Sequence, residues 1–164
     1  MAAASSIAST RRGLLLAAKT YEAYYDLALQ LSTGELARDY LVLCHGWVPP
    51  TLYEIAAPVY WSGDEMPTSS GAQGKPSRTQ LKVMAHVSHG NDALCLVIIR
   101  IATGRRHQIR SHFSHIGHPT VCDGMYTASS TFHADMKLCT RNFLHRYRLA
   151  FKDLVGGDHE ALEP

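Results

Sequence analysis

The sequence is poor in cysteine, whose disulfide bonds stabilise many small secreted proteins. It contains only four cysteines in 164 residues, and no two of them are close in sequence: Cys44, Cys95, Cys122 and Cys139. This spacing excludes a disulfide framework and the paired CxxC pattern of structural zinc sites. We therefore expect reduced thiols in an intracellular protein. No apolar run is long enough to span a bilayer, so we expect no membrane partner.

Acidic residues are absent from two stretches of the chain. None precedes Glu22, and none lies between Asp92 and Asp123. The formal net charge is only +2, so overall charge says little about binding partners. The second acid-free stretch, however, holds a cluster of arginines and histidines. Such a local concentration of positive charge indicates a binding site for an anion such as RNA.

The chain is long enough for one domain with a substantial core. Its hydrophobic content of 46% is typical of globular proteins. Residues 1–12 are rich in alanine and serine and carry Arg11 and Arg12, as organelle transit peptides do. We therefore divide the chain into an N-terminal tail (1–12), one domain (13–152) and a C-terminal tail (153–164). A mitochondrion or another organelle is the expected location, with the cytoplasm as the alternative.

The stretch 98–126 organises the rest of the chain. An apolar run over 93–99 leads into it and predicts a buried strand. Thr103 and Gly104 then predict a turn in which the threonine side chain caps a following helix. One face of this helix is apolar, and Gly117 and Pro119 are expected to end it. The apolar face consists of Ile109, Phe113 and Ile116.

Three arginines lie near the start of this helix: Arg105, Arg106 and Arg110. Cations at a helix N-terminus oppose the helix dipole, so they do not stabilise the helix itself. A bound anion explains their placement better. The alternative interpretation is a basic face that contacts only solvent.

Further elements are expected on either side of this stretch. A helix is predicted over 22–36, with Thr20 as its N-cap. Strands are predicted from Arg38 onward, over 78–84 and over 143–151, with a turn at 89–92. Residues 126–141 are expected to form a loop, and the polar residues 156–164 a frayed end.

The central motifs resemble those of a known family. Residues 103–113, TGRRHQIRSHF, are followed by HIGHP and CDGMY. This series resembles the third motif of the RluA-type RNA pseudouridine synthases, TGRTHQIRVHL followed by GHPIVGDxxYG. The departures are Arg106 for Thr, Ser111 for Val and Cys122 for Gly. The matching positions are Thr103, Gly104, Arg105, His107, Gln108, Ile109, Arg110, His112, Gly117, His118, Pro119, Asp123 and Tyr126.

Weaker matches extend the resemblance over residues 13–152. Residues 13–20, GLLLAAKT, resemble the segment that follows the family's catalytic loop, HRLDxxTSGLLLLAKT. Tyr40 follows the pattern KxYLALV, and 143–151 resemble FLHAxxLxF. Extension from Gly13 places Ala8 where the family has its nucleophilic Asp, with Ser5 and Ser6 on the preceding His and Arg.

The resemblance implies an α+β fold with a mixed, mostly antiparallel sheet and flanking helices, incomplete at its N-terminus. It also implies isomerisation of uridine to pseudouridine in ribosomal or transfer RNA, without cofactor or metal. The target base leaves the stack, and a nucleophilic Asp attacks it. By position, Arg110 is the partner of that Asp and Tyr40 stacks on the base. RNA-binding positions are Arg105, Arg106, His107, Gln108 and Ile109.

The missing Asp leaves two interpretations of the function. In one, a catalytic loop precedes Gly13 in a longer chain and the protein is an enzyme. In the other, the chain is an inactive homologue that binds RNA or serves as a structural subunit of a ribonucleoprotein. A third interpretation, independent of the resemblance, is a zinc site with nitrogen and sulfur ligands. Its ligands are His112, His115, His118 and Cys122.

Overall fold

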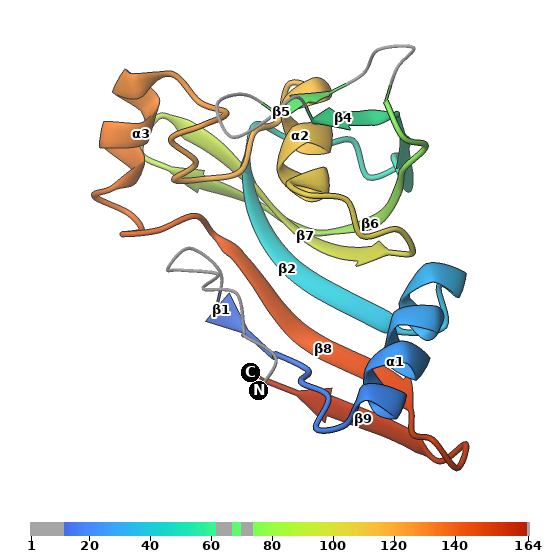
Figure 1. Ribbon diagram of the computed structural model, residues 1–164. Coiled ribbons are helices and arrows are strands. Elements are labelled where there is room, and N and C mark those ends of the chain that lie inside the picture. Colours follow the sequence, from blue (N-terminus) through green and yellow to red (C-terminus); the bar gives the residue numbers. More distant parts are fainter. Residues whose placement is uncertain (1–11, 62–66, 70–73, 164) are drawn as a thin grey trace.

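The computed structural model describes residues 12–61, 67–69 and 74–163 (Figure 1). The helices in these ranges are α1 (Tyr21–Thr33), α2 (Gln108–His115) and α3 (Ser129–Asp135). The strands are β1 (Arg12–Gly13), β2 (Ala37–His45), β3 (Glu54–Ala56), β4 (Val59–Trp61), β5 (Pro67–Ser69), β6 (Arg78–His89), β7 (Asp92–Ile101), β8 (Leu144–Lys152) and β9 (Asp158–Leu162). None of these helices is long and apolar enough to cross a membrane.

Seven of the strands form one sheet in the order β1-β8-β2-β7-β6-β3, and β9 also pairs with β8. Only the β1–β8 pairing in this sheet is parallel. Strands β4 and β5 form a separate antiparallel pair. Figure 1 shows α2 and α3 on one side of the sheet, with α1 beside the far ends of β2 and β8. The predicted α+β class, with its mostly antiparallel sheet and flanking helices, is confirmed.

One face of the central strands is fully buried because apolar side chains alternate along it. In β7, Cys95, Val97 and Ile99 are fully buried, as the apolar run predicted. Strands β6 and β7 form a long hairpin whose last pair is His89 with Asp92. Gly90, at the tip, has φ +60°, a conformation that favours glycine in tight turns. The predicted turn at 89–92 is therefore confirmed.

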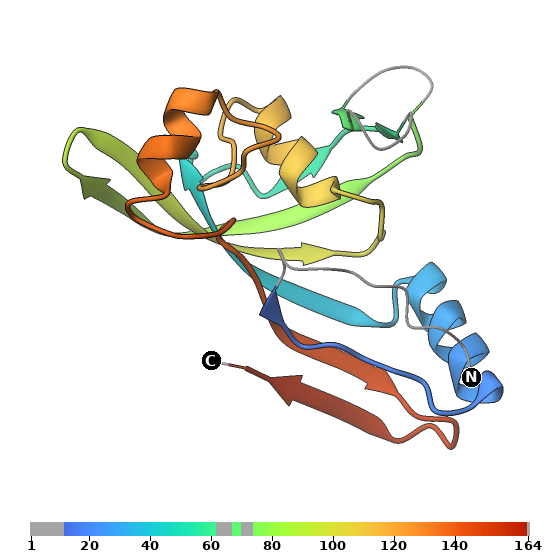
Figure 2. The ribbon, with the colours of Figure 1, turned by 60° about the vertical axis from the view of Figure 1, so that its left-hand side comes forward.

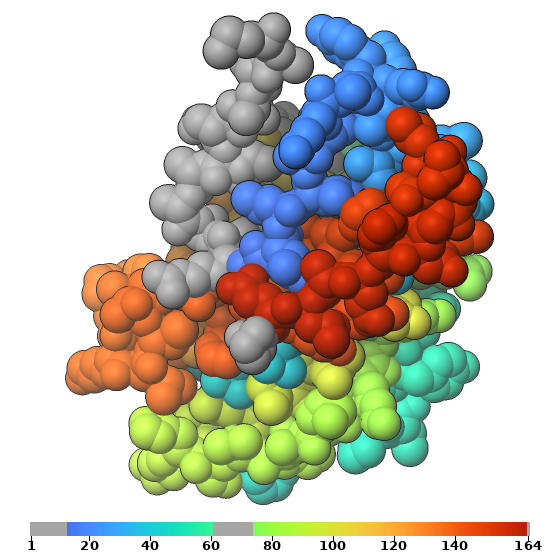
Figure 3. Space-filling model, turned by 90° about the horizontal axis from the view of Figure 1, so that it is seen from below, coloured from blue at the N-terminus to red at the C-terminus, as the bar shows by residue number. Residues whose placement is uncertain are grey.

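Helix α1 is capped at both ends, by Thr20 before its first turn and by Gly34 after its last. The Thr20 hydroxyl accepts a hydrogen bond from the Ala23 amide, as predicted for an N-cap. Gly34 adopts φ +82° and ends the helix, so it stops at Thr33 rather than Leu36. The buried Gln30 side chain bonds to both the amide and the carbonyl of Lys152, which fixes α1 against the end of β8. Seen from below, α1 lies close to the C-terminal strands (Figure 3).

Two expectations about irregular segments are wrong. The predicted loop over 126–141 contains α3, and the segment expected to fray contains β9. Both elements depend on tertiary contacts. The Asp135 carboxylate at the end of α3 accepts hydrogen bonds from the Cys122 amide and contacts the His45 ring. Strand β9 pairs with the outer edge of β8, and the views in Figures 1 and 2 show it lying alongside that strand.

An ion-pair network ties four strands together on the sheet face opposite α2. The Asp39 carboxylate in β2 accepts hydrogen bonds from Arg100 in β7 at 2.6 and 2.7 Å and from Arg148 in β8 at 3.0 Å. Arg148 also pairs with Glu160 in β9. Burial alone raises the pKa of Asp39, but the hydrogen bonds from Arg100 and Arg148 outweigh it and hold this pKa below its usual value.

This network should make folding stability depend on pH. Because the folded-state pKa of Asp39 is lowered, its contribution is present above about pH 4 and is lost as the carboxylate is protonated at lower pH. We predict that Asp39→Asn lowers the free energy of unfolding by about 1–3 kcal/mol at pH 7. Urea denaturation at pH 7 and near pH 3 measures this. The difference between the variant and the natural chain should shrink at the lower pH, and an equal difference at both would contradict the prediction.

Candidate RNA-binding cleft

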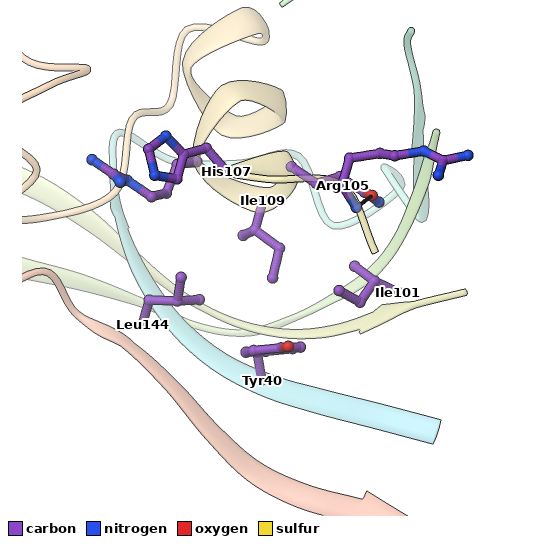
Figure 4. Close-up of a pocket in the computed structure, with 8 residues that line it drawn as sticks. Tyr40, Ile101, Arg105, His107, Ile109 and Leu144 are labelled. Carbon is purple, nitrogen blue, oxygen red and sulfur yellow. Dashed lines mark hydrogen bonds between the residues drawn. The ribbon is translucent and has the colours of Figure 1, made fainter. Parts of the chain in front are cut away.

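A cleft lies between the first turn of α2 and the strands beneath it (Figure 4). It has about 320 Å³ of space, part of it open to solvent. We call it the tyrosine cleft, after the residue on its floor. It brings together all the predicted site residues among those described except Arg106. Its lining consists of Tyr40, Ile101, Arg105, His107, Gln108, Ile109, Arg110 and Leu144.

The turn before α2 is held by Gln108, whose side chain is 2% exposed. Its amide oxygen accepts hydrogen bonds from the Thr103 hydroxyl at 2.9 Å and the Arg105 amide at 3.1 Å. Its amide nitrogen donates to the Arg78 carbonyl and the Thr79 hydroxyl. Gln108 was expected to bind RNA, but these contacts use its amide within the protein. It therefore shapes the turn that presents Arg105.

Helix α2 begins at a strained residue. The predicted cap, Thr103, is wrong, because its hydroxyl bonds to Gln108 and the helix starts after His107. His107 has φ +54°, an uncommon conformation for a non-glycine residue that is often found at functional sites. Its ring packs edge-on against Tyr126 at 6.3 Å between centroids. Figure 4 shows His107 and Arg105 pointing to opposite sides of Ile109, so the turn spreads them along the rim.

Arg110 is held by a buried carboxylate. Its Nε donates to Oδ2 of Asp123 at 2.6 Å and its Nη2 to Oδ1 at 2.5 Å. The side chains of Arg110 and Asp123 are 15% and 0% exposed. Tyr126 covers the guanidinium, with its ring centroid 5.0 Å from Cζ, and burial raises the pKa of this tyrosine to about 12. A buried arginine needs such an acid, and Asp123 supplies it.

Tyr40 forms the floor of the cleft. It is 7% exposed, and Figure 4 shows the Ile109 side chain pointing toward its ring from above. Arg146 in β8 donates from Nε to the Tyr40 hydroxyl at 3.2 Å, with its Cζ 5.3 Å from the ring centroid. The pair Tyr40 and Ile109 thus bounds a flat apolar slot. Cations stand around it, an arrangement suited to a planar base attached to phosphates.

The eight residues that line the cleft include no Asp or Glu. Asp39, next to Tyr40 in β2, points to the other face, where Arg100 and Arg148 hold it. Ala8, the position aligned with the family's nucleophile, lies outside the described residues. The described lining of the cleft therefore contains no carboxylate that could take the part of the family's nucleophile.

The alternative zinc site is not assembled. Both ring nitrogens of the fully buried His112 are used, one by the Thr79 hydroxyl at 2.8 Å and one by the Ala57 carbonyl at 2.9 Å. Burial lowers the pKa of His112, so it is held neutral between these partners. In the part of the chain that the structure describes, no three His, Cys, Asp or Glu side chains are grouped to hold a metal ion.

Comparison with known proteins agrees with the geometry of the cleft. The family model for RNA pseudouridylate synthase matches residues 11–115. The chain belongs to this family. The resemblance of the central motifs to the RluA-type synthases is thereby confirmed, since the matched region includes Tyr40 and the whole turn up to Arg110.

Two bacterial relatives illustrate the similarity. Ribosomal large subunit pseudouridine synthase C of Haemophilus ducreyi is 34% identical over 146 residues, which are 85% of this chain and 44% of that protein. Synthase D of Nitrosomonas europaea is 36% identical over 142 residues, 84% of this chain and 40% of that protein. The chain thus spans less than half the length of these relatives.

Solved structures of family members share the fold. Human RNA pseudouridylate synthase domain containing 1 superposes with a TM-score of 0.74 at 26% identity, over 89% of this chain and 61% of that one. Human RNA pseudouridylate synthase domain containing 4 gives a TM-score of 0.66 at 15% identity, over 88% and 64%. The second likeness concerns the fold alone.

Sequence reasoning missed two cations next to the tyrosine of this pseudouridylate synthase cleft. Arg146 could have been noticed in the sequence, because it is a cation where the family pattern FLHAxxLxF has Ala. Arg38 precedes Tyr40 by two residues, and strand alternation places both on the same face. The role of Asp123 as the acid for Arg110 could not be read from the motif, because the two positions are thirteen residues apart in different segments.

The Arg110–Asp123 pair should be among the most stabilising contacts of the cleft. Removing one partner leaves a buried charge unpaired, so we predict that Asp123→Ala lowers the free energy of unfolding by about 3–5 kcal/mol. Arg110→Ala should be similarly costly. The double variant should cost clearly less than the sum of the two, with a coupling of about 1–3 kcal/mol. Chemical denaturation of all four proteins gives this coupling, and strictly additive effects would show that the pair does not act as a unit.

Proposed function

We propose that this chain forms the RNA-binding cleft of an enzyme that converts uridine to pseudouridine in RNA, with ribosomal RNA as the first candidate substrate. The observation that carries the proposal is the slot between Tyr40 and Ile109, bordered by Arg105 and Arg110. The names of the bacterial relatives, ribosomal large subunit pseudouridine synthases, support ribosomal rather than transfer RNA.

The geometry supports recognition of an extruded base. A uridine inside a duplex cannot place its base between two side chains, so the target leaves the stack and packs between Tyr40 and Ile109. The cost of unstacking is offset by contact with the aromatic ring and by backbone phosphates at Arg105 and Arg106. Isomerisation then needs cleavage of the bond between the base and the sugar, rotation of the base and attachment through C5. The reaction needs neither cofactor nor metal.

A carboxylate nucleophile is the component that the cleft lining does not contain. This observation favours a second candidate function. In it the chain binds RNA without modifying it, as an inactive homologue or a structural subunit of a ribonucleoprotein. The two functions share the cleft and differ only in whether a carboxylate reaches the base above Tyr40.

Binding of RNA should depend on salt through the arginines of the turn. Each phosphate that is neutralised contributes about −0.7 to the slope of log K against log salt concentration for a single strand. We predict that replacing both Arg105 and Arg106 by Ala flattens this slope by about 1.4. Fluorescence anisotropy with a labelled single-stranded RNA over a series of salt concentrations measures it.

A matched control removes two positive charges elsewhere. Lys82 and Lys137 are exposed, one on the outer face of β6 and one after α3. The double variant Lys82→Ala with Lys137→Ala should leave the slope within experimental error. Equal flattening in both double variants would mean that RNA responds to net charge alone, and the arginines would then be a solvated basic face.

Catalysis by the 164-residue chain is tested directly with RNA tritiated at C5 of uridine, since attachment through C5 releases the label. We predict that the purified chain releases no tritium above background, because no carboxylate lies in the described cleft. Retained RNA binding would then support the second candidate function for this chain.

Release of tritium would overturn that expectation. In that case Tyr40→Ala, which removes the floor of the slot, should abolish release while RNA binding through Arg105 persists. Unchanged release in this variant would place the reaction outside the tyrosine cleft.

A further inference from the structure

Arg38 is a buried cation that has no counter-charge among the residues the structure describes. It is 8% exposed, and within the described part of the chain its Nε and Nη2 atoms have no hydrogen-bond partner. Its guanidinium lies under the turn that carries Arg105, since a β-carbon on Gly104 would lie 2.8 Å from Arg38 Nη1. An unpaired buried charge lowers the stability of a fold, and no described residue offsets this cost for Arg38.

A second arginine stands next to the first. Arg146 donates one hydrogen bond to the Tyr40 hydroxyl and another from Nη1 to the Leu14 carbonyl at 2.9 Å. Burial lowers the pKa of Arg38, and the charge of Arg146 lowers it further. Two cations are thus held close together beside Tyr40.

The acids that the structure describes nearby do not compensate them. Asp39 serves Arg100 and Arg148 on the opposite face of β2, and Asp26 in α1 accepts a hydrogen bond from Gln30. Neither pairs with Arg38 or Arg146 in the described part of the chain. A negatively charged group from outside the fold would remove both the repulsion and the unpaired charge.

A second cleft is lined by both arginines. It lies between α1, the segment before it and the strands β2 and β8, and has about 840 Å³ of space, part of it open to solvent. We call it the α1 cleft. Arg38 and Arg146 line it together with apolar side chains, among them Leu15, Tyr24, Leu27 and Leu149. Figures 1 and 2 show α1 standing at the ends of β2 and β8.

The two clefts are neighbours. Arg146 lines the α1 cleft and contacts Tyr40, which forms the floor of the tyrosine cleft. A strand of RNA whose target base lies on Tyr40 continues past this contact. The α1 cleft offers that strand cations for a phosphate and an aromatic and aliphatic wall for a base.

We propose that the α1 cleft is a binding subsite for a nucleotide flanking the target, with its phosphate on Arg38 and Arg146 and its base against Tyr24 and the leucines of α1. The subsite rests on the proposed function for its biological ligand. Its chemistry, recognition of one nucleoside monophosphate, can be tested without that function.

The first test measures thermal unfolding of the full chain with uridine 5′-monophosphate, uridine or inorganic phosphate at equal ionic strength. A ligand that binds only the folded state raises Tm in a saturable way. The monophosphate should stabilise more than either of its parts, because it fills both the cationic and the apolar portions. No stabilisation by the monophosphate, or a rise matched by phosphate alone, would overturn the subsite. The latter result would indicate an adventitious ion only.

Variants locate the site. Arg146→Ala should weaken the monophosphate about tenfold or more, and Arg146→Lys less. Tyr24→Ala should weaken it about fivefold. The matched control Tyr53→Ala removes another exposed tyrosine, at 77% exposure, outside both clefts. It should have no effect, and Arg105→Ala in the tyrosine cleft should weaken the monophosphate less than Tyr24→Ala does. An effect of Arg105→Ala equal to that of Tyr24→Ala would move binding to the tyrosine cleft and overturn the subsite.

The variant Arg38→Met distinguishes a ligand-binding arginine from a purely structural one. An apolar side chain of similar length removes the unpaired charge, so the free variant should be more stable than the natural chain. It should at the same time lose most of the stabilisation by the monophosphate. A variant that is less stable when free would show that Arg38 is satisfied inside the fold, and the proposal would fail.

The RNA arm separates this inference from the proposed function. Arg146→Ala should reduce the salt slope of RNA binding by about 0.7, and Lys82→Ala should leave it unchanged. If the monophosphate binds as expected and RNA does not bind at all, the proposed function fails while the subsite stands. If RNA binds with an unchanged slope in Arg146→Ala, its phosphate does not occupy the α1 cleft and the flanking-nucleotide assignment is wrong.

Discussion

The bidentate pair between Arg110 and Asp123 fixes the geometry on which the tyrosine cleft depends. The Asp123 carboxylate accepts hydrogen bonds from two nitrogens of Arg110, from the Thr120 hydroxyl and from the Met125 amide. Four donors satisfy a carboxylate that is fully buried, so the pair holds α2 against the segment that follows it. An isolated Thr120 bridge to Cys44 joins that segment to the end of β2. The helix that carries Ile109 is therefore positioned relative to the strand that carries Tyr40.

Strand β2 separates two kinds of electrostatic environment. On one face Asp39 neutralises Arg100 and Arg148, and the result is a network that holds β7, β2 and β8 together. On the other face Tyr40 is surrounded by cations whose charge the described neighbours do not balance, Arg38 and Arg146 among them. The register of β2 against β8 shifts between Asp39 and Tyr40. A sheet stabilised by paired charges on its outer face can tolerate unpaired charges on its inner face, where a polyanion is expected to bind.

Most of the fold could be predicted from local signals. The apolar run before the central motif, the turn at Gly90 and the Thr20 cap each specify an element by local chemistry, and each is found in the structure. Strand β9 and helix α3 could not be predicted, because pairing with β8 and the contacts of Asp135 create them. The same distinction applies to the cleft. The motif identified its residues, whereas the internal role of Gln108, the partner of Arg110 and the place of Arg146 beside Tyr40 depend on segments distant in sequence.

Catalysis at the tyrosine cleft depends on whether one carboxylate lies near Tyr40. The resemblance to the synthases makes Arg110 the partner of the nucleophile, but Asp123 already occupies its Nε and Nη2. Only Nη1 is left outside that pair for a second acid. A carboxylate beside the Tyr40 hydroxyl would also lie near Arg146, which donates a hydrogen bond to that hydroxyl. Nearby cations lower the pKa of a carboxyl group, so such a nucleophile would be ionised at neutral pH without further help from Arg110. The arginines near Tyr40 would thus favour the charged form of an acid placed there. On the proposed function, a carboxylate at that position is what separates a synthase from a protein that only binds RNA.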